Sequence, residues 1–60
     1  MAAIRRYVTA WNNLGDAFEK ATKIKDAFNS YSEALSYAPD NKIASARVQA
    51  LRTKLDRYTA

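Results

Sequence analysis

The sequence predicts an all-α protein built from three short helices. Apolar residues recur every three to four positions along three segments, which is the period of an α-helix. No segment alternates apolar and polar residues as a strand does, and one glycine and one proline among 60 residues provide too few turns for a β-protein. Because the breaks between the segments are short, we expect successive helices to lie antiparallel.

The first helix is expected over residues 4–21. On a helical wheel with about 100° per residue and Val8 at zero, its apolar and polar residues fall into two separate arcs. The apolar arc, between roughly 180° and 340°, contains Ile4, Tyr7, Ala10, Trp11, Leu14, Gly15, Ala17, Phe18 and Ala21. The polar arc, between roughly 20° and 140°, contains Thr9, Asn12, Asn13, Asp16, Glu19 and Lys20. This segment is therefore one amphipathic helix with a wide apolar face.

The second helix is expected over residues 23–37, with Thr22 as its N-cap. Pro39 ends it, because the residue before a proline is pushed out of the α region. Its apolar face consists of Ile24, Ala27, Phe28, Tyr31, Ala34, Leu35 and Ala38. The third helix is expected over residues 42–58, after an N-cap supplied by Asp40–Asn41. Its apolar stripe consists of Ala44, Val48, Leu51, Leu55 and Tyr58.

Gly15 needs a specific reason, because a glycine inside a helix costs about 1 kcal/mol relative to alanine. The close approach of another backbone would supply that reason, and Ala27 is the expected small partner. Larger side chains are expected to stack on either side of this contact. They are Trp11, Leu14 and Phe18 from the first helix and Phe28, Tyr31 and Leu35 from the second.

The spacing of these residues follows one pattern: Trp11-x2-Leu14-Gly15-x2-Phe18, then Ala27-x3-Tyr31, then Ala34 and Pro39. This pattern resembles the tetratricopeptide repeat, a helix–turn–helix unit of about 34 residues. Two aromatic positions are exchanged relative to the family, with phenylalanine at 18 and tyrosine at 31. The resemblance implies a fragment of an α-solenoid, with one complete repeat over residues 8–41. Residues 1–7 would extend its first helix, and residues 42–60 would form a C-terminal capping helix.

The resemblance also implies a binding surface, because the first helix of each repeat lines the concave groove of such arrays. The residues carried over to this concave face are Thr9, Asn12, Asn13, Asp16, Glu19 and Lys20. Since Asp16 and Glu19 are acidic, a mixed or basic partner segment is expected to fit this face better than an acidic tail. A face without any ligand is the alternative.

The net charge of +4 is concentrated in the third helix. Residues 1–41 contain equal numbers of basic and acidic residues, whereas residues 42–60 carry the whole excess. Four cations share the arc beside its apolar stripe and form a basic stripe, namely Lys42, Arg47, Lys54 and Arg57. This basic stripe is expected either to keep a capping helix soluble or to contact an acidic protein, phosphates of a nucleic acid or anionic lipid. Aromatic residues that would stack on bases are missing from it.

The composition also limits the chemistry. Without histidine or cysteine, the chain has no Ser–His or Cys–His nucleophile and no zinc ligands of these types. We expect no enzyme activity, cofactor, metal or small-molecule substrate, and no transmembrane or targeting segment. The expected location is intracellular and soluble, with cytosol and organelle matrix both left open.

A helix hairpin of this kind has one face for each neighbouring repeat, and one of them is expected to stay open here. The residues expected on the open face are Ile4, Tyr7, Val8 and the outer side of Tyr31 or Tyr37. An open apolar face marks a protein contact. The predicted function is therefore protein–protein interaction of the scaffold, adaptor or complex-assembly type, with self-association or membership of a larger complex. Binding of nucleic acid or an acidic surface through the basic third helix is the alternative.

Overall fold

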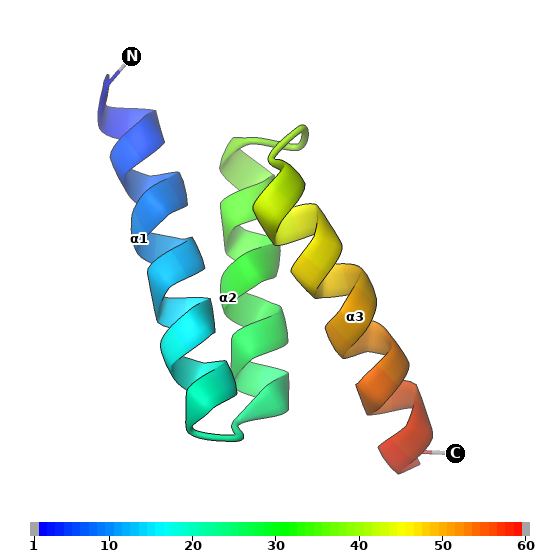
Figure 1. The fold of residues 1–60 in the computed structure, drawn as a ribbon. Helices are drawn as coiled ribbons and strands as arrows, with labels where there is room; N and C mark the ends of the chain where they lie inside the picture. Colours follow the sequence, from blue (N-terminus) through cyan, green and yellow to red (C-terminus); the bar gives the residue numbers. More distant parts are fainter. Residues whose placement is uncertain (1, 60) are drawn as a thin grey trace.

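The computed structural model describes the backbone of residues 2–59 and the side chains of residues 4–57. It contains three helices, α1 (Ala2–Lys20), α2 (Ile24–Tyr37) and α3 (Lys42–Thr59), and the described backbone includes no strand. The all-α prediction is confirmed, and each helix begins and ends close to its predicted position. In Figure 1, α1 and α2 form an antiparallel hairpin, and α2 lies between α1 and α3.

The molecule is a thin layer of helices, with principal extents of 41 × 21 × 13 Å. Its core is correspondingly small, and half of the buried apolar side chains are alanines. The buried apolar residues among the described side chains are Val8, Ala27, Tyr31, Ala34, Ala44 and Leu51. Around them pack half-buried residues, namely Trp11, Phe18, Ile24, Phe28, Leu35, Ala38 and Val48. The alanines let the helix backbones approach closely, and Tyr31 and Leu51 fill the remaining space.

Gly15 is explained by a close contact with α2, although its partner differs from the expected one. A Cβ atom at Gly15 would lie 2.8–2.9 Å from three ring carbons of Tyr31, which is closer than carbon atoms pack. The missing side chain therefore makes room for the buried ring of Tyr31, not for Ala27. Ala27 is fully buried, as a core position should be, but the atoms nearest to Gly15 belong to Tyr31.

The turn between α1 and α2 corrects the prediction for Thr22. The N–H of Lys23 donates to the carbonyl of Phe18 at 2.8 Å, and the N–H of Thr22 donates to the carbonyl of Glu19 at 2.9 Å. These two bonds form a Schellman motif, which ends a helix with one residue in the left-handed region. Thr22 is that residue, with φ of 61°. It therefore closes α1, and the residue at the N-cap of α2 is Lys23, which makes no side-chain capping bond.

The connection between α2 and α3 follows the prediction. α2 ends at Tyr37, before Ala38 and Pro39. Asn41 then caps α3, because its Oδ1 accepts a hydrogen bond from the N–H of Ala44 at 2.9 Å. α3 thus turns back along α2 and runs in the same general direction as α1 (Figure 1).

The open apolar surface differs in part from the prediction. Ile4, Tyr7 and Tyr37 are exposed as expected, and the rings of Tyr7 and Tyr37 stack with their centroids 5.5 Å apart. Val8 and Tyr31, in contrast, are buried.

Two residues predicted for the repeat core, Leu14 and Pro39, are exposed, and Ile43 is an exposed apolar residue that the prediction missed. Leu14 lies two turns beyond Tyr7 on the same side of α1 and is 41% exposed. Pro39 lies in the α2–α3 connection, so its contribution is to end α2. The predicted apolar position of Tyr58 lies outside the side chains that the structure describes.

Candidate functional site

The candidate site is the polar surface where side chains of α1 and α3 meet across α2. Two bridges join these helices, and the stronger one pairs Glu19 of α1 with Arg47 of α3. Arg47 donates from Nε to Glu19 Oε1 at 2.8 Å and from Nη2 to Glu19 Oε2. Such a two-point pair holds the guanidinium and carboxylate planes in one orientation. The sequence placed these residues in two separate sets, the concave face and the basic stripe, and the structure joins them.

Tyr31 of α2 lies beside this pair and connects it to the core. The hydrogen bond from Arg47 is the main cause that lowers the pKa of Glu19 below its ordinary value of 4.5. The same bond raises the pKa of Arg47. Burial, followed by hydrogen bonding to Glu19, raises the pKa of the Tyr31 hydroxyl to about 12. All three groups therefore keep their ordinary protonation states across the neutral range, and none is prepared to transfer a proton there.

The second bridge is weaker and lies nearer the start of α3. Asn12 donates from Nδ2 to Asn41 Oδ1 at 3.3 Å, and the same oxygen caps α3. The Oδ1 atom of Asn12 is buried and accepts no hydrogen bond from any residue that the structure describes. Since a buried acceptor without a partner offsets part of the gain, this bridge stabilises less than the Glu19–Arg47 pair.

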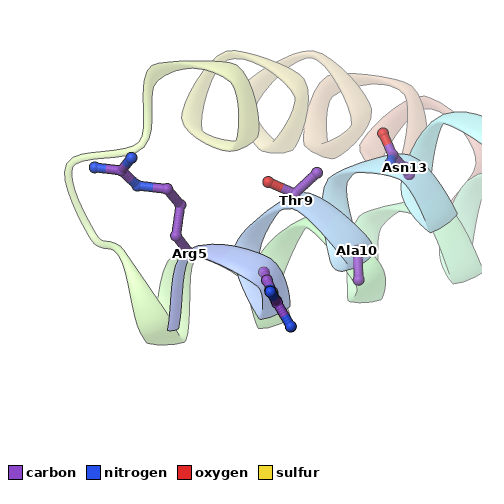
Figure 2. A pocket seen from close by; sticks show the side chains of 5 residues that line it. Arg5, Thr9, Ala10 and Asn13 are labelled. Atoms are coloured by element: carbon purple, nitrogen blue, oxygen red, sulfur yellow. The ribbon is translucent and has the colours of Figure 1, made fainter. Parts of the chain in front are cut away.

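The other predicted residues of the concave face are exposed side chains of α1. They are Thr9, Asn13, Asp16 and Lys20. Asp16 and Lys20 lie one turn apart and form an ion pair, with 3.0 Å between Oδ2 and Nζ. In Figure 2, Thr9 and Asn13 point to the side of α1 on which α3 lies, whereas Ala10 points the other way. The residues predicted for the concave face therefore divide into an exposed row on α1 and a half-buried pair, Asn12 and Glu19, that bridges to Asn41 and Arg47.

The basic stripe of α3 is divided by the structure. Arg47 is half-buried against Glu19, whereas Lys42, Lys54 and Arg57 are exposed. Arg52 lies on another side, where its guanidinium sits 5.9 Å from the ring centroid of Phe28. The cations that can meet a partner thus lie towards the two ends of α3, separated by the neutralised Arg47.

Two of the hollows on the described surface are lined by residues predicted for the concave face. One, of about 470 Å³, lies along α1 and is lined by Arg5, Arg6, Thr9, Ala10 and Asn13 (Figure 2). Neither arginine was singled out by the sequence patterns, because both lie before the repeat pattern begins. The other, of about 710 Å³, lies between the α1–α2 turn and the C-terminal half of α3. Its lining residues are Glu19, Thr22, Ile24, Lys54 and Arg57.

The structure describes neither a metal-binding cluster nor a membrane-spanning helix beside this surface. Among the residues with described side chains, no three acidic groups gather as the ligands of a metal ion would. No described helix is both long enough and apolar enough to cross a lipid bilayer. The polar groups available to a ligand are amides, hydroxyls and surface charges, which can form hydrogen bonds and ion pairs with it.

Comparison with known proteins gives one informative relative. The chain is 48% identical over 52 residues to a protein of Arabidopsis thaliana described as "Tetratricopeptide repeat domain-containing protein PYG7, chloroplastic". The aligned region covers 87% of this chain and 17% of the length of that relative. No family model matches the sequence, and no solved structure matches it.

Proposed function

Because the chain belongs to the tetratricopeptide-repeat family, we propose that it binds a segment of a partner protein along the face between α1 and α3. Arrays of this type act as scaffolds whose stacked helices form extended binding surfaces. In this proposal residues 8–41 are the repeat, residues 1–7 extend its first helix, and α3 is the capping helix.

The observation that carries the proposal is the exposed polar row of α1, which is held in place by contacts with α2 and α3. Thr9, Asn13 and Asp16 stand in the open, although their helix is packed against α2 on its other side. The Glu19–Arg47 pair holds α3 beside this row. A surface whose helices are positioned in advance binds with a smaller loss of conformational freedom.

The proposal assigns no catalytic role to the chain. It describes a scaffold, adaptor or complex-assembly module that acts by presenting side chains, as part of a larger complex or by self-association. An intracellular location is part of the proposal, and the name of the Arabidopsis relative makes the chloroplast one compartment to examine.

Nucleic-acid binding through α3 has less support than protein binding. Arg47 is engaged with Glu19, and Arg52 lies against Phe28. The exposed cations that remain on the stripe do not form a continuous track along α3, as a phosphate backbone would require.

The proposed function is tested by selecting a phage-displayed peptide library on the folded 60-residue chain. Selected peptides should bind the wild type and lose binding to Asn13→Arg, because the larger arginine side chain would cover part of the exposed row of α1. The matched control is Asn29→Arg, an exposed asparagine on α2, and it should bind normally. A library that yields no binder, or binders equally weakened by both variants, would contradict this function.

A further inference from the structure

We propose that the partner segment is acidic and that one of its carboxylates binds in the 710 Å³ hollow between the α1–α2 turn and α3. This inference rests on the proposed function, because it names the chemistry of the segment that the same face would bind. It reverses the expectation for the α1 face, where the acidic residues favoured a mixed or basic partner, and it takes up the alternative of an acidic surface on the basic third helix.

The reversal follows from the ion pairs inside the chain. Asp16 is paired with Lys20, and Glu19 is paired with Arg47. Each carboxylate of the predicted concave face is thus matched by a cation of the same chain. A basic partner would have to compete with these existing pairs, and for Glu19 it would have to replace a two-point contact.

The unmatched charges around the hollow are positive. Lys54 and Arg57 are exposed, and neither forms an ion pair with a side chain that the structure describes. They lie three residues apart on α3, a spacing that puts both on one side of a helix. Lys54 is close enough to help lower the pKa of Glu19, which places its charge over the same hollow. A carboxylate entering there would meet an ammonium group and a guanidinium group together.

The other lining residues of the hollow are Thr22, Ile24 and Glu19, whose carboxylate is already paired with Arg47. Ile24 is half-buried and offers an apolar surface to the methylene groups that carry a carboxylate. The hollow has no aromatic lining on which a base could stack. A second copy of the chain would bring a net charge of +4 towards these cations, which opposes its approach. Charge complementarity therefore favours an acidic protein segment over both other occupants.

The test uses fluorescence anisotropy with a short labelled peptide rich in glutamate and aspartate. The matched probe replaces each acidic residue by its amide, and an oligonucleotide of equal charge is the third probe. The acidic peptide should bind, and the amide peptide should not. Lys54→Glu with Arg57→Glu should weaken binding of the acidic peptide roughly tenfold or more, because two attractions become repulsions.

The control is Lys25→Glu with Arg52→Glu, which changes the net charge equally at exposed positions outside the hollow and outside the basic stripe. It should weaken binding about twofold at most, through the general field alone. Circular dichroism confirms that both double variants keep their helices. Equal losses in the two double variants, tighter binding of the oligonucleotide, or self-association that needs Lys54 and Arg57 would each overturn the inference. If the library instead yields neutral or basic peptides and the acidic probe does not bind, this inference fails while the proposed function stands.

Discussion

Helix α1 meets its two neighbours through different kinds of contact. Towards α2 it contributes Val8 to an apolar core and places Gly15 against the ring of Tyr31. Towards α3 it contributes a carboxylate and an amide, which bridge to Arg47 and Asn41. Burial of apolar surface is the main force that stabilises a fold, whereas an ion pair in contact with water adds about 1 kcal/mol or less. The apolar contacts therefore hold the chain together, and the polar bridges decide how α3 sits beside α1.

Removing a buried apolar side chain should weaken the apolar contacts and cause the largest loss of stability among these predictions. Leu51 is completely buried, and Leu51→Ala should lower the free energy of unfolding by about 3 kcal/mol through lost burial and the cavity left behind. Urea unfolding followed by circular dichroism measures the change. For so small a domain, this loss amounts to most of the stability.

The same substitution at Leu14 is the matched control, because that side chain is 41% exposed. Leu14→Ala should cost about 1 kcal/mol or less, since little apolar surface returns to water. Similar losses at both positions would mean that the α2–α3 contact does not carry the apolar core.

Removing the charge of Glu19 should break the ion pair with Arg47 and cause a smaller loss of stability. Glu19→Gln keeps the shape and loses the ion pair, so the free energy of unfolding at neutral pH should fall by roughly 1 kcal/mol. The pKa of Glu19 is lowered in the folded chain, mainly by the hydrogen bond from Arg47. The unfolded chain therefore takes up the proton at higher pH, and acid favours unfolding. The wild type should lose this contribution as the pH falls below 4.5, and the variant should have none to lose there.

Denaturant unfolding at a series of pH values measures this difference, and Glu33→Gln provides the control. Glu33 is an exposed carboxylate on α2, so its replacement should leave the stability curve parallel to that of the wild type. Parallel curves for Glu19→Gln and the wild type would show that the pair with Arg47 adds nothing to the fold.

The sequence predicted the apolar half of this molecule better than the polar half. Periodicity placed the three helices, because it depends on neighbours along the chain, and the fixed spacing of Trp11, Gly15 and Ala34 matched the pattern of a known helix hairpin. The exposure of Leu14 escaped prediction, since a wide apolar arc does not say which of its sides meets α2.

The bridge between Glu19 and Arg47 could not be predicted, because it joins residues 28 positions apart and depends on how α3 crosses the hairpin. One signal was present: on the wheel Glu19 lies only about 20° from the buried Val8, at the border of the core. An acidic residue at such a border needs a partner, and the basic residues of the third helix were the nearest candidates in the fold. The sequence could therefore indicate that a pair forms, but not which cation completes it.

Relieving the backbone strain at Thr22 tests the turn by itself, because this residue belongs neither to the apolar contacts with α2 nor to the polar bridges to α3. A residue other than glycine in the left-handed region destabilises the folded chain by roughly 1–2 kcal/mol. Replacement by glycine removes this strain, but part of the gain is lost because glycine gives the unfolded chain more conformational freedom. Thr22→Gly should therefore stabilise the chain by about 0.5 kcal/mol, which raises the Tm by roughly 3 °C in a domain of this size. Lys23→Gly is the control in the same turn: Lys23 has φ of −89°, where glycine relieves no strain, so its Tm should stay level or fall. Thermal melts of both variants decide the point. A lower Tm for Thr22→Gly would mean that the side chain, whose hydroxyl donates to the carbonyl of Ala21 at 2.6 Å, stabilises the turn by more than its backbone strain costs.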